Sequence, residues 1–226
     1  RHGDILRASV ASAGNDHRLG ANEAPPAIIS VFLGEQLSRI LDEIEQGLVP
    51  VASDSAIIDL GVSSIPQLSR DTSDRNRTSP FAFTGNKFEF RAPGASQSIS
   101  FPAAVLNTIV SESLDDLADV IELKMKNAGS TDIKQVVLDV VREELHTIKA
   151  VLFMGDNYSK EWENEAIKRG LPDLKTSPDA FPALVTPKAL HLFEKYGVLR
   201  DIELHSRYAV RLERSEERRV GKECRS

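Results

Sequence analysis

The sequence predicts an α+β fold, with strands confined to its first hundred residues and helices filling the rest. Three short runs have the composition and the bounding turn residues of strands, at 56–60, 81–83 and 88–91. From about residue 102 onward, apolar residues recur at helical spacing over long stretches. We therefore expect a mixed region at 1–100, followed by a helical region at 101–213.

The mixed region is expected to begin with a loop and a helix. Residues 8–26 are rich in Ala, Ser, Gly, Asn and Pro, which is typical of a loop. A helix is expected over 28–48, because apolar residues recur there at helical spacing, a proline suits its first turn and a glycine its end. The strands at 81–83 and 88–91 flank a Thr-Gly-Asn turn, which favours a hairpin or two successive sheet segments.

The helical region contains five segments with helical periodicity. We expect helices at 102–129, 133–148, 159–169, 187–196 and 200–213. Ser130 or Thr131 suits the N-cap of the second of these helices.

The composition is that of an ordinary globular protein and argues against several functional classes. The 226 residues are 41% hydrophobic and 27% charged, and 34 acidic against 28 basic residues leave a net charge of −6. No basic block precedes the last thirteen residues, so a nucleic-acid partner is not expected. No run approaches the roughly 18 apolar residues that cross a bilayer, and the first residues lack a signal-peptide pattern. We expect a cytoplasmic protein that binds neither nucleic acid nor membranes.

The two ends of the sequence have unusual patterns. Residues 4–8 look like the tail of a helix already under way, so we expect the chain to be a fragment. Residues 214–226 have almost no apolar content and resemble the translation of a common sequencing adapter, so we expect them to be an artefact and disordered. A natural disordered basic tail is the alternative. Cys224, the only cysteine, lies there, so neither a disulfide framework nor a cysteine metal site is expected.

The strand at 88–91 carries the most distinctive charge pattern. With the strand period of two, Lys87, Glu89 and Arg91 share one face and two phenylalanines share the other. An edge strand with a salt-bridge ladder facing water would have this pattern. A strand lining a site would have it too, with Glu89 available to a divalent cation and Arg91 to a carboxylate or phosphate.

Two polar segments are further candidates. Glu23 stands between a polar loop and the rigid pair Pro25-Pro26, an arrangement typical of lids, although it is equally typical of an exposed acid near a helix N-terminus. Arg75 and Arg77 lie in a stretch too polar to pack, where they could grip an anionic ligand such as a nucleotide phosphate or form surface salt bridges. The five histidines lack the spacing of a metal site, so no histidine ligand is assigned.

Three motifs, in this order, resemble the C-terminal part of the glutamine synthetase catalytic domain. They begin with Asn-Asp-His-Arg-Leu at 15–19 and Glu-Ala-Pro at 23–25, and continue with Arg-Asn-Arg-Thr-Ser at 75–79. The third is Phe-Glu-Phe-Arg-Ala-Pro at 88–93. The type III branch is resembled in particular by the sequence of residues 74–91 and by the segments at 155–159 and 193–199. The resemblance covers residues 1–213.

The resemblance implies ATP-dependent joining of ammonia to L-glutamate through γ-glutamyl phosphate. It assigns Glu89 to the Mg²⁺ or Mn²⁺ ion that bridges the nucleotide phosphates, and Arg91 and Arg18 to glutamate. It assigns Lys87 and Arg77 to the ATP phosphates. Glu23 matches the acid of a flap that closes over the substrate and takes a proton from ammonium.

The resemblance also implies a fold and an assembly. Residues 1–100 would complete a catalytic β-barrel, 101–213 would form the helical C-terminal region, and the intact protein would be a double-ring homo-oligomer. The family's other metal ligands would lie upstream of Arg1, so the chain alone is expected to be inactive. The flap register departs by one residue from the type I pattern, and a phosphate-binding arginine of that type has no counterpart near Ala82. A related γ-glutamyl-amine ligase and a non-catalytic helical assembly module are the alternatives.

Overall fold

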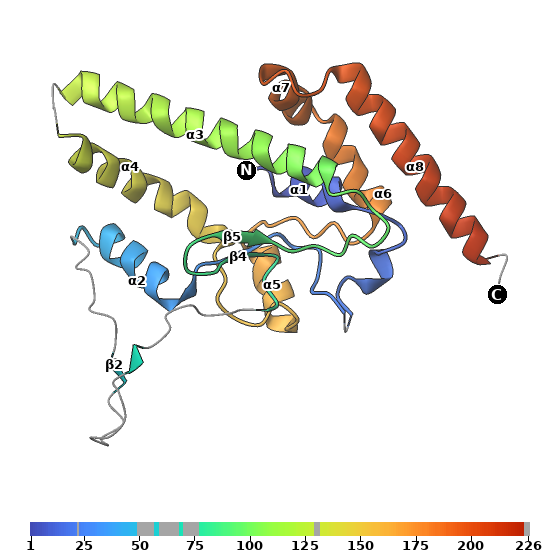
Figure 1. Ribbon diagram of the computed structural model, residues 1–226, viewed down its shortest axis with the longest axis horizontal. Helices are drawn as coiled ribbons and strands as arrows, with labels where there is room; N and C mark the ends of the chain where they lie inside the picture. The colour runs from blue at the N-terminus through green and yellow to red at the C-terminus, as the bar shows by residue number, and fades with distance from the viewer. Residues whose placement is uncertain (22, 49–56, 59–67, 70–76, 129–131, 224–226) are drawn as a thin grey trace.

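The computed structural model describes residues 1–21, 23–48, 57–58, 68–69, 77–128 and 132–223 (Figure 1). Its α-helices are α1 (Gly3–Val10), α2 (Gly34–Glu45), α3 (Ser100–Ala128), α4 (Ile133–Ile148), α5 (Lys160–Lys168), α6 (Ser177–Ala180), α7 (Pro187–Lys195) and α8 (Asp201–Glu223). Its 3-10 helices are η1 (Asp16–Arg18), η2 (Lys149–Val151) and η3 (Phe181–Val185). Its strands are β1 (Val31–Phe32), β2 (Ile57–Ile58), β3 (Leu68–Ser69), β4 (Phe81–Phe83) and β5 (Phe88–Phe90).

The described strands form one three-stranded and one two-stranded sheet. In the larger sheet β4 is central, parallel to β1 and antiparallel to β5, and Ala82 lies opposite Glu89. β2 pairs with β3 in antiparallel fashion. The predicted hairpin and the predicted strand at 56–60 are thereby confirmed, the latter at Ile57–Ile58. The α+β class is also confirmed, whereas the described strands form no closed barrel, so the catalytic barrel stays a prediction.

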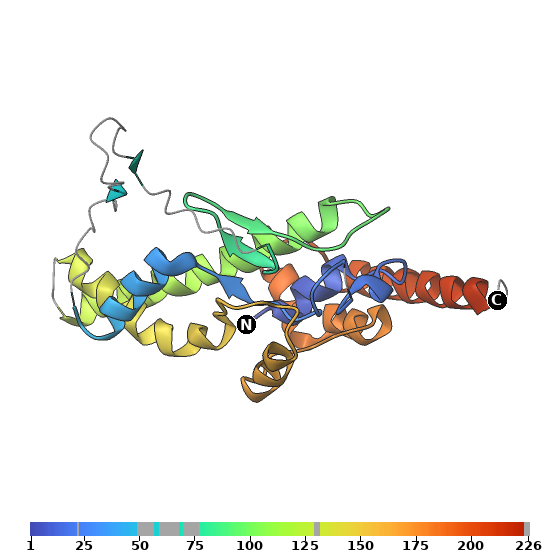
Figure 2. The same cartoon turned by 90° about the horizontal axis from the view of Figure 1, so that it is seen from below.

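The long helices lie at two ends of the molecule. α3 and α4 form an antiparallel hairpin with α2 beside α4, while α8 extends at the opposite end (Figures 1 and 2). α3, α4, α5 and α7 confirm four of the five predicted helices within one or two residues at most ends. The N-cap of α4 is Asp132, which accepts hydrogen bonds from two backbone amides. Both predicted caps, Ser130 and Thr131, lie outside the described residues.

The main hydrophobic core joins the start of the chain to its last helices. It contains buried side chains of α1, α3, η3, α7 and α8, among them Ile5, Leu6, Phe101, Val105, Phe181, Leu192, Phe193 and Leu204. A smaller cluster holds Trp162 of α5 against Ile28, with the Phe153 ring stacked on the indole at 3.9 Å between centroids. The boundary predicted near residue 100 therefore crosses a shared core. No helix in the described part of the chain is long and apolar enough to span a membrane.

The helix predicted from residue 28 begins only at Gly34. Val31 and Phe32 instead form β1, which pairs in parallel with β4. This pairing satisfies hydrogen-bonding groups of the β1 backbone and buries Phe32. The free energy of these tertiary contacts outweighs the local preference for helix. Gly34 has a φ of +80°, a left-handed conformation that allows the turn from strand to helix.

The last helix is longer than the sequence predicts. α8 continues to Glu223, which corrects the expectation of disorder for residues 214–223. Glu, Arg and Lys favour helix once one is nucleated, and α8 packs on η3, with Ser215 buried. The adapter origin of 214–226 stays a prediction. α6 and η3 were not predicted, since their helical turns are too short to establish a period.

Candidate functional site

The three charged residues of β5 and its end lie together on one face, as the strand period predicts. Glu89 Oε2 accepts hydrogen bonds from Arg91 Nη2 at 2.8 Å and Arg91 Nε at 3.2 Å. Lys87 Nζ lies 3.4 Å from the other carboxylate oxygen. The side chains of Glu89 and Arg91 are 36% and 32% exposed, so they face neither the core nor bulk water alone.

These two cations keep Glu89 ionised. The hydrogen bond from Arg91, followed by that from Lys87, lowers the pKa of the Glu89 carboxyl below its ordinary value. A carboxylate held in this state can bind a cation without first losing a proton. On the opposite side of the hairpin, the rings of Phe81 and Phe88 stack with centroids 5.5 Å apart, and Phe88 is half exposed.

Arg18 and Glu23 form an ion pair within the polar loop. Arg18 Nε lies 2.5 Å from Glu23 Oε2, and Arg18 Nη1 donates to Asn15 Oδ1 at 3.1 Å. The loop folds back tightly, because Gly20 adopts a φ of +71° and its amide donates to the Ala24 carbonyl. Glu23 is 63% exposed, so this pair contributes little to stability and can open readily.

The base of the loop is tied to the helical region. Asp16 accepts hydrogen bonds from both the amide and the hydroxyl of Ser177, each at 2.7 Å. The buried Arg7 lies 3.6 Å from the same carboxylate and donates to the Leu174 carbonyl. The buried Asn15 donates to the Ala95 carbonyl, which follows β5. The loop that carries Arg18 is thus positioned from two sides.

Arg77 is exposed and precedes a well-anchored segment. Thr78 contacts the buried Asn157, whose amide group also donates to Ser30 Oγ at 2.7 Å. Asn157 thereby ties the approach to β4 to the extended stretch before β1. Arg75 and the other residues of this motif up to residue 76 lie outside the described part of the chain.

A small cavity of about 40 Å³ separates the polar loop from the end of β5. Asn15, Asp16 and Leu19 line it from the loop, and Arg91 and Pro93 from the strand side. Its volume has room for water only. The structure therefore places the Arg18 loop and Arg91 around one space, while Glu89 on β5 and Lys87 just before β5 lie next to Arg91.

Among the described residues, Glu89 is the one predicted to bind a metal ion. Glu89 offers one hard carboxylate, a suitable ligand for Mg²⁺ or Mn²⁺. Within the described ranges, no group of three or more His, Cys, Asp or Glu residues could hold a metal ion. Glu89 therefore fits one position among the ligands of such an ion.

Sequence reasoning missed the residues that position the site. Asp16 and Asn157 are polar, and Asn157 lies in a Gly-Asp-Asn segment that favours a surface turn. Their contacts are with Ser177, Thr78 and Ser30, all far away in the sequence. Their only signal was membership of the motifs at 15–19 and 155–159.

Known proteins are similar to this chain over most of its length. Residues 136–220 match the family model described as glutamine synthetase C-terminal domain. A protein of Dictyostelium discoideum named type-3 glutamine synthetase is 46% identical over 213 residues, which cover 94% of this chain and 28% of that protein. Proteins named glutamine synthetase are 39% identical in Bacteroides fragilis and 41% in Butyrivibrio fibrisolvens, over 93% and 92% of this chain and 29% of each relative.

The chain thus spans less than a third of the length of these curated relatives. Nearly all of it aligns with them at 39–46% identity, and its last helices match the C-terminal domain of the family. Along nearly its whole length this chain is therefore similar to a segment of type-3 glutamine synthetase, and its residues 136–220 match the glutamine synthetase C-terminal domain.

Proposed function

We propose that the intact protein to which this chain belongs is a ligase that uses ATP to join ammonia to L-glutamate. The observation that carries the proposal is the shared face of Glu89 and Arg91, within a sequence 46% identical to a type-3 glutamine synthetase. The γ-phosphoryl group of ATP passes to the γ-carboxylate of glutamate and leaves ADP. Ammonia then attacks the acyl carbon of γ-glutamyl phosphate, and phosphate departs to leave glutamine.

The first step brings negative charge from ATP and glutamate into one place, so it requires fixed positive charge. Lys87 and Arg77 bind the ATP phosphates, and both are exposed enough to reach a ligand. Arg91 binds glutamate through a guanidinium that the Glu89 carboxylate already orients. This orientation limits the reorganisation needed when substrate arrives.

Glu89 also supplies one ligand to Mg²⁺ or Mn²⁺, alongside ligands outside the described residues. When bound, the ion would offset the charge of the transferring phosphoryl group. The lowered pKa of Glu89 supports this role, because the carboxylate is ionised throughout the neutral range.

The loop residues serve the second step. Arg18 binds the carboxylate of glutamate, which replaces Glu23 as its partner and frees the Glu23 side chain. Glu23 then attracts ammonium and accepts its proton, and the closed loop keeps water from the acyl phosphate. The ion pair between Arg18 and Glu23 supports this exchange, since both side chains lie within reach of one another and of solvent.

The intact protein acts as a homo-oligomer, for which a double ring is the proposed form. Several large apolar side chains on the α3–α4 hairpin are exposed in the single chain and available for contacts between subunits. They are Val110, Leu114, Leu123, Ile133 and Ile148.

Product analysis of the intact protein tests the proposed reaction. With ATP and glutamate, ammonia should yield glutamine, and methylamine or ethylamine should yield little of the γ-glutamyl amide. Faster turnover with the amines would identify a γ-glutamyl-amine ligase instead. If no ADP forms with ammonia or with the amines, the non-catalytic assembly module is favoured. Glu89→Ala should then leave the absence of activity unchanged.

A further inference from the structure

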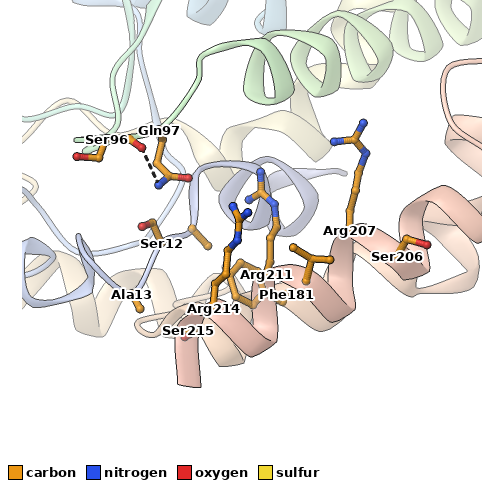
Figure 3. A pocket seen from close by; sticks show the side chains of 12 residues that line it. Ser12, Ala13, Ser96, Gln97, Phe181, Ser206, Arg207, Arg211, Arg214 and Ser215 are labelled. Atoms are coloured by element: carbon orange, nitrogen blue, oxygen red, sulfur yellow. Dashed lines mark hydrogen bonds between the residues drawn. The ribbon is translucent and has the colours of Figure 1, made fainter. Parts of the chain in front are cut away.

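A second and larger pocket lies between α8 and two loops of the first region. It has a volume of about 520 Å³, within the range of small-molecule sites. Ser12 and Ala13 line it from one loop, and Ser96 and Gln97 from the loop that follows β5 (Figure 3). None of Lys87, Glu89 and Arg91 lines it, so it is separate from the candidate active site.

The charge of this pocket is entirely positive. Arg207, Arg211 and Arg214 enter it from successive turns of α8, and no acidic residue is among its lining residues (Figure 3). No carboxylate in the described part of the chain forms an ion pair with Arg207 or Arg211. Most other arginines of the helices up to α7 pair with an acid, as Arg142 of α4 does with Asp139 at 3.0 Å. Arg207 and Arg211 therefore form no close ion pair among the described residues. The pKa of Glu203, one turn before Arg207 on α8, is nevertheless lowered by hydrogen bonds from Arg200 and then by the charge of Arg207.

Arg211 is held in place by packing contacts that partly remove its guanidinium from water. Its guanidinium lies over the Phe101 ring at 4.5 Å and donates to the Ser9 carbonyl at 3.2 Å. Arg207 lies over the same ring at 5.3 Å. Burial lowers the pKa of Arg211 from its ordinary value, and the positive charge of Arg207 lowers it further. Two like charges are thus preorganised around one ring, with donors left over for a ligand.

Neutral donors complete the lining. The hydroxyls of Ser12 and Ser206 and the Gln97 amide group lie around the arginines, and Val210 and Phe181 form an apolar wall. Gln97 already donates to the Ser96 carbonyl at 3.2 Å, which orients its side chain (Figure 3). Such a mixture suits an anionic head group attached to a small carbon skeleton.

We infer that this pocket binds a small anion that carries two or more negative charges as phosphate or carboxylate groups. The inference depends on Arg207 and Arg211 and not on Arg214, because Arg214 belongs to the segment that resembles adapter sequence. It is also independent of the proposed reaction. An anion in this pocket would contact Ser12, which also lines the small cavity beside Arg91. Its binding would therefore affect residues next to the candidate active site.

Isothermal titration calorimetry on the intact protein tests the inference, without nucleotide or metal. The probes are inorganic phosphate, glycerol 2-phosphate and citrate at low ionic strength. At least one should bind with a dissociation constant of about 1 mM or tighter. The probe that binds most tightly identifies the class of anion that the pocket prefers: a free phosphate, a phosphate ester or a polycarboxylate.

The variants separate this pocket from other anion sites. Arg207→Gln and Arg211→Gln should each weaken binding about tenfold or more, because each removes charge-assisted hydrogen bonds. Arg200→Gln is the matched control: Arg200 precedes α8, is 79% exposed and lies outside the pocket, so its loss should leave binding unchanged.

Two results would overturn the inference. One is the absence of saturable binding by all three probes. The other is equal affinity in the parent protein and in Arg207→Gln, whose exposed side chain can be replaced without disturbing the core. Circular dichroism of each variant checks its folding, and if Arg211→Gln unfolds, the comparison of Arg207→Gln with Arg200→Gln decides the matter.

Discussion

Two neighbouring cations, Arg91 and Lys87, lower the pKa of the Glu89 carboxyl. Its lowered pKa follows first from the hydrogen bond with Arg91 and then from that with Lys87. The contribution of this pair to folding is present above the ordinary glutamate pKa and is lost as the pH falls through the lowered value. The pair is partly exposed, so its value to stability is small, and its importance lies in orienting Arg91.

Titration of Glu89 checks this assignment. We expect ¹³C NMR of labelled Glu side chains to show a Glu89 midpoint below that of ordinary glutamates. In Arg91→Gln the Glu89 midpoint should rise toward the ordinary value. Arg39 lies on α2, so Arg39→Gln should leave the Glu89 midpoint unchanged. An identical midpoint in the parent and in Arg91→Gln would contradict the observed pairing.

Glu23 gives a prediction about catalysis. Glu23→Ala in the intact protein should lower the ammonia-dependent rate by roughly 10²–10⁴-fold, the usual range for loss of a general base. The apparent affinity for ATP should change little, because Glu23 lies on the polar loop and not on β5 with Lys87. Initial rates at varied ammonia and ATP measure both quantities. A normal turnover number would disprove the flap role.

At the scale of elements, η1 connects the candidate site with the helical region. The Asp16 carboxylate at its start holds the amide and hydroxyl of Ser177 at the start of α6. The buried Arg7 also lies beside it, so the carboxylate balances a charge that solvent hardly reaches. The helical region thereby positions the loop that carries Arg18.

Removal of this connection should destabilise the chain. Asp16→Ala is expected to lower the free energy of unfolding by about 1–3 kcal/mol, because it leaves polar groups of Ser177 and Arg7 unsatisfied. Asp119→Ala, on the exposed face of α3, should change it by less than about 0.5 kcal/mol. Urea denaturation measures both. Equal stability of the two variants would mean that water replaces the lost contacts.

Elements with local signals could be predicted from the sequence. The β4–β5 hairpin follows from alternating residues around a turn, and α4 follows from regular apolar spacing. β1 could not be predicted, because its pairing partner β4 lies far along the chain and the intervening apolar spacing equally suits a helix. The continuation of α8 was missed because few apolar residues follow Glu213.

At the scale of the molecule, one core links both ends of the chain. Ile5 of α1 and Leu204 of α8 belong to the same buried cluster, and Phe181 of η3 lies between them in sequence. The strands of the candidate site are therefore supported by helices from the opposite end of the chain. We expect the two predicted regions to unfold together.

A core substitution tests this cooperativity. Leu192→Ala should lower the free energy of unfolding by about 2–5 kcal/mol, since Leu192 is fully buried. Ile202→Ala, at a position 68% exposed, should change it by less than about 0.5 kcal/mol. Transitions followed by Trp162 fluorescence and by far-ultraviolet circular dichroism should coincide. Separate transitions would indicate two independent folding units.

Several features could be predicted from the sequence, because each depends on residues close together along the chain: the α+β class, the hairpin, most helices and the common face of Lys87, Glu89 and Arg91. Other features are visible only in the folded chain: β1 forms where a helix was expected, Asp16 and Asn157 anchor the polar loop and the approach to β4, and Arg207 and Arg211 share a pocket with Ser12 and Gln97. These features depend on contacts between distant segments, whose free energy outweighs local preference.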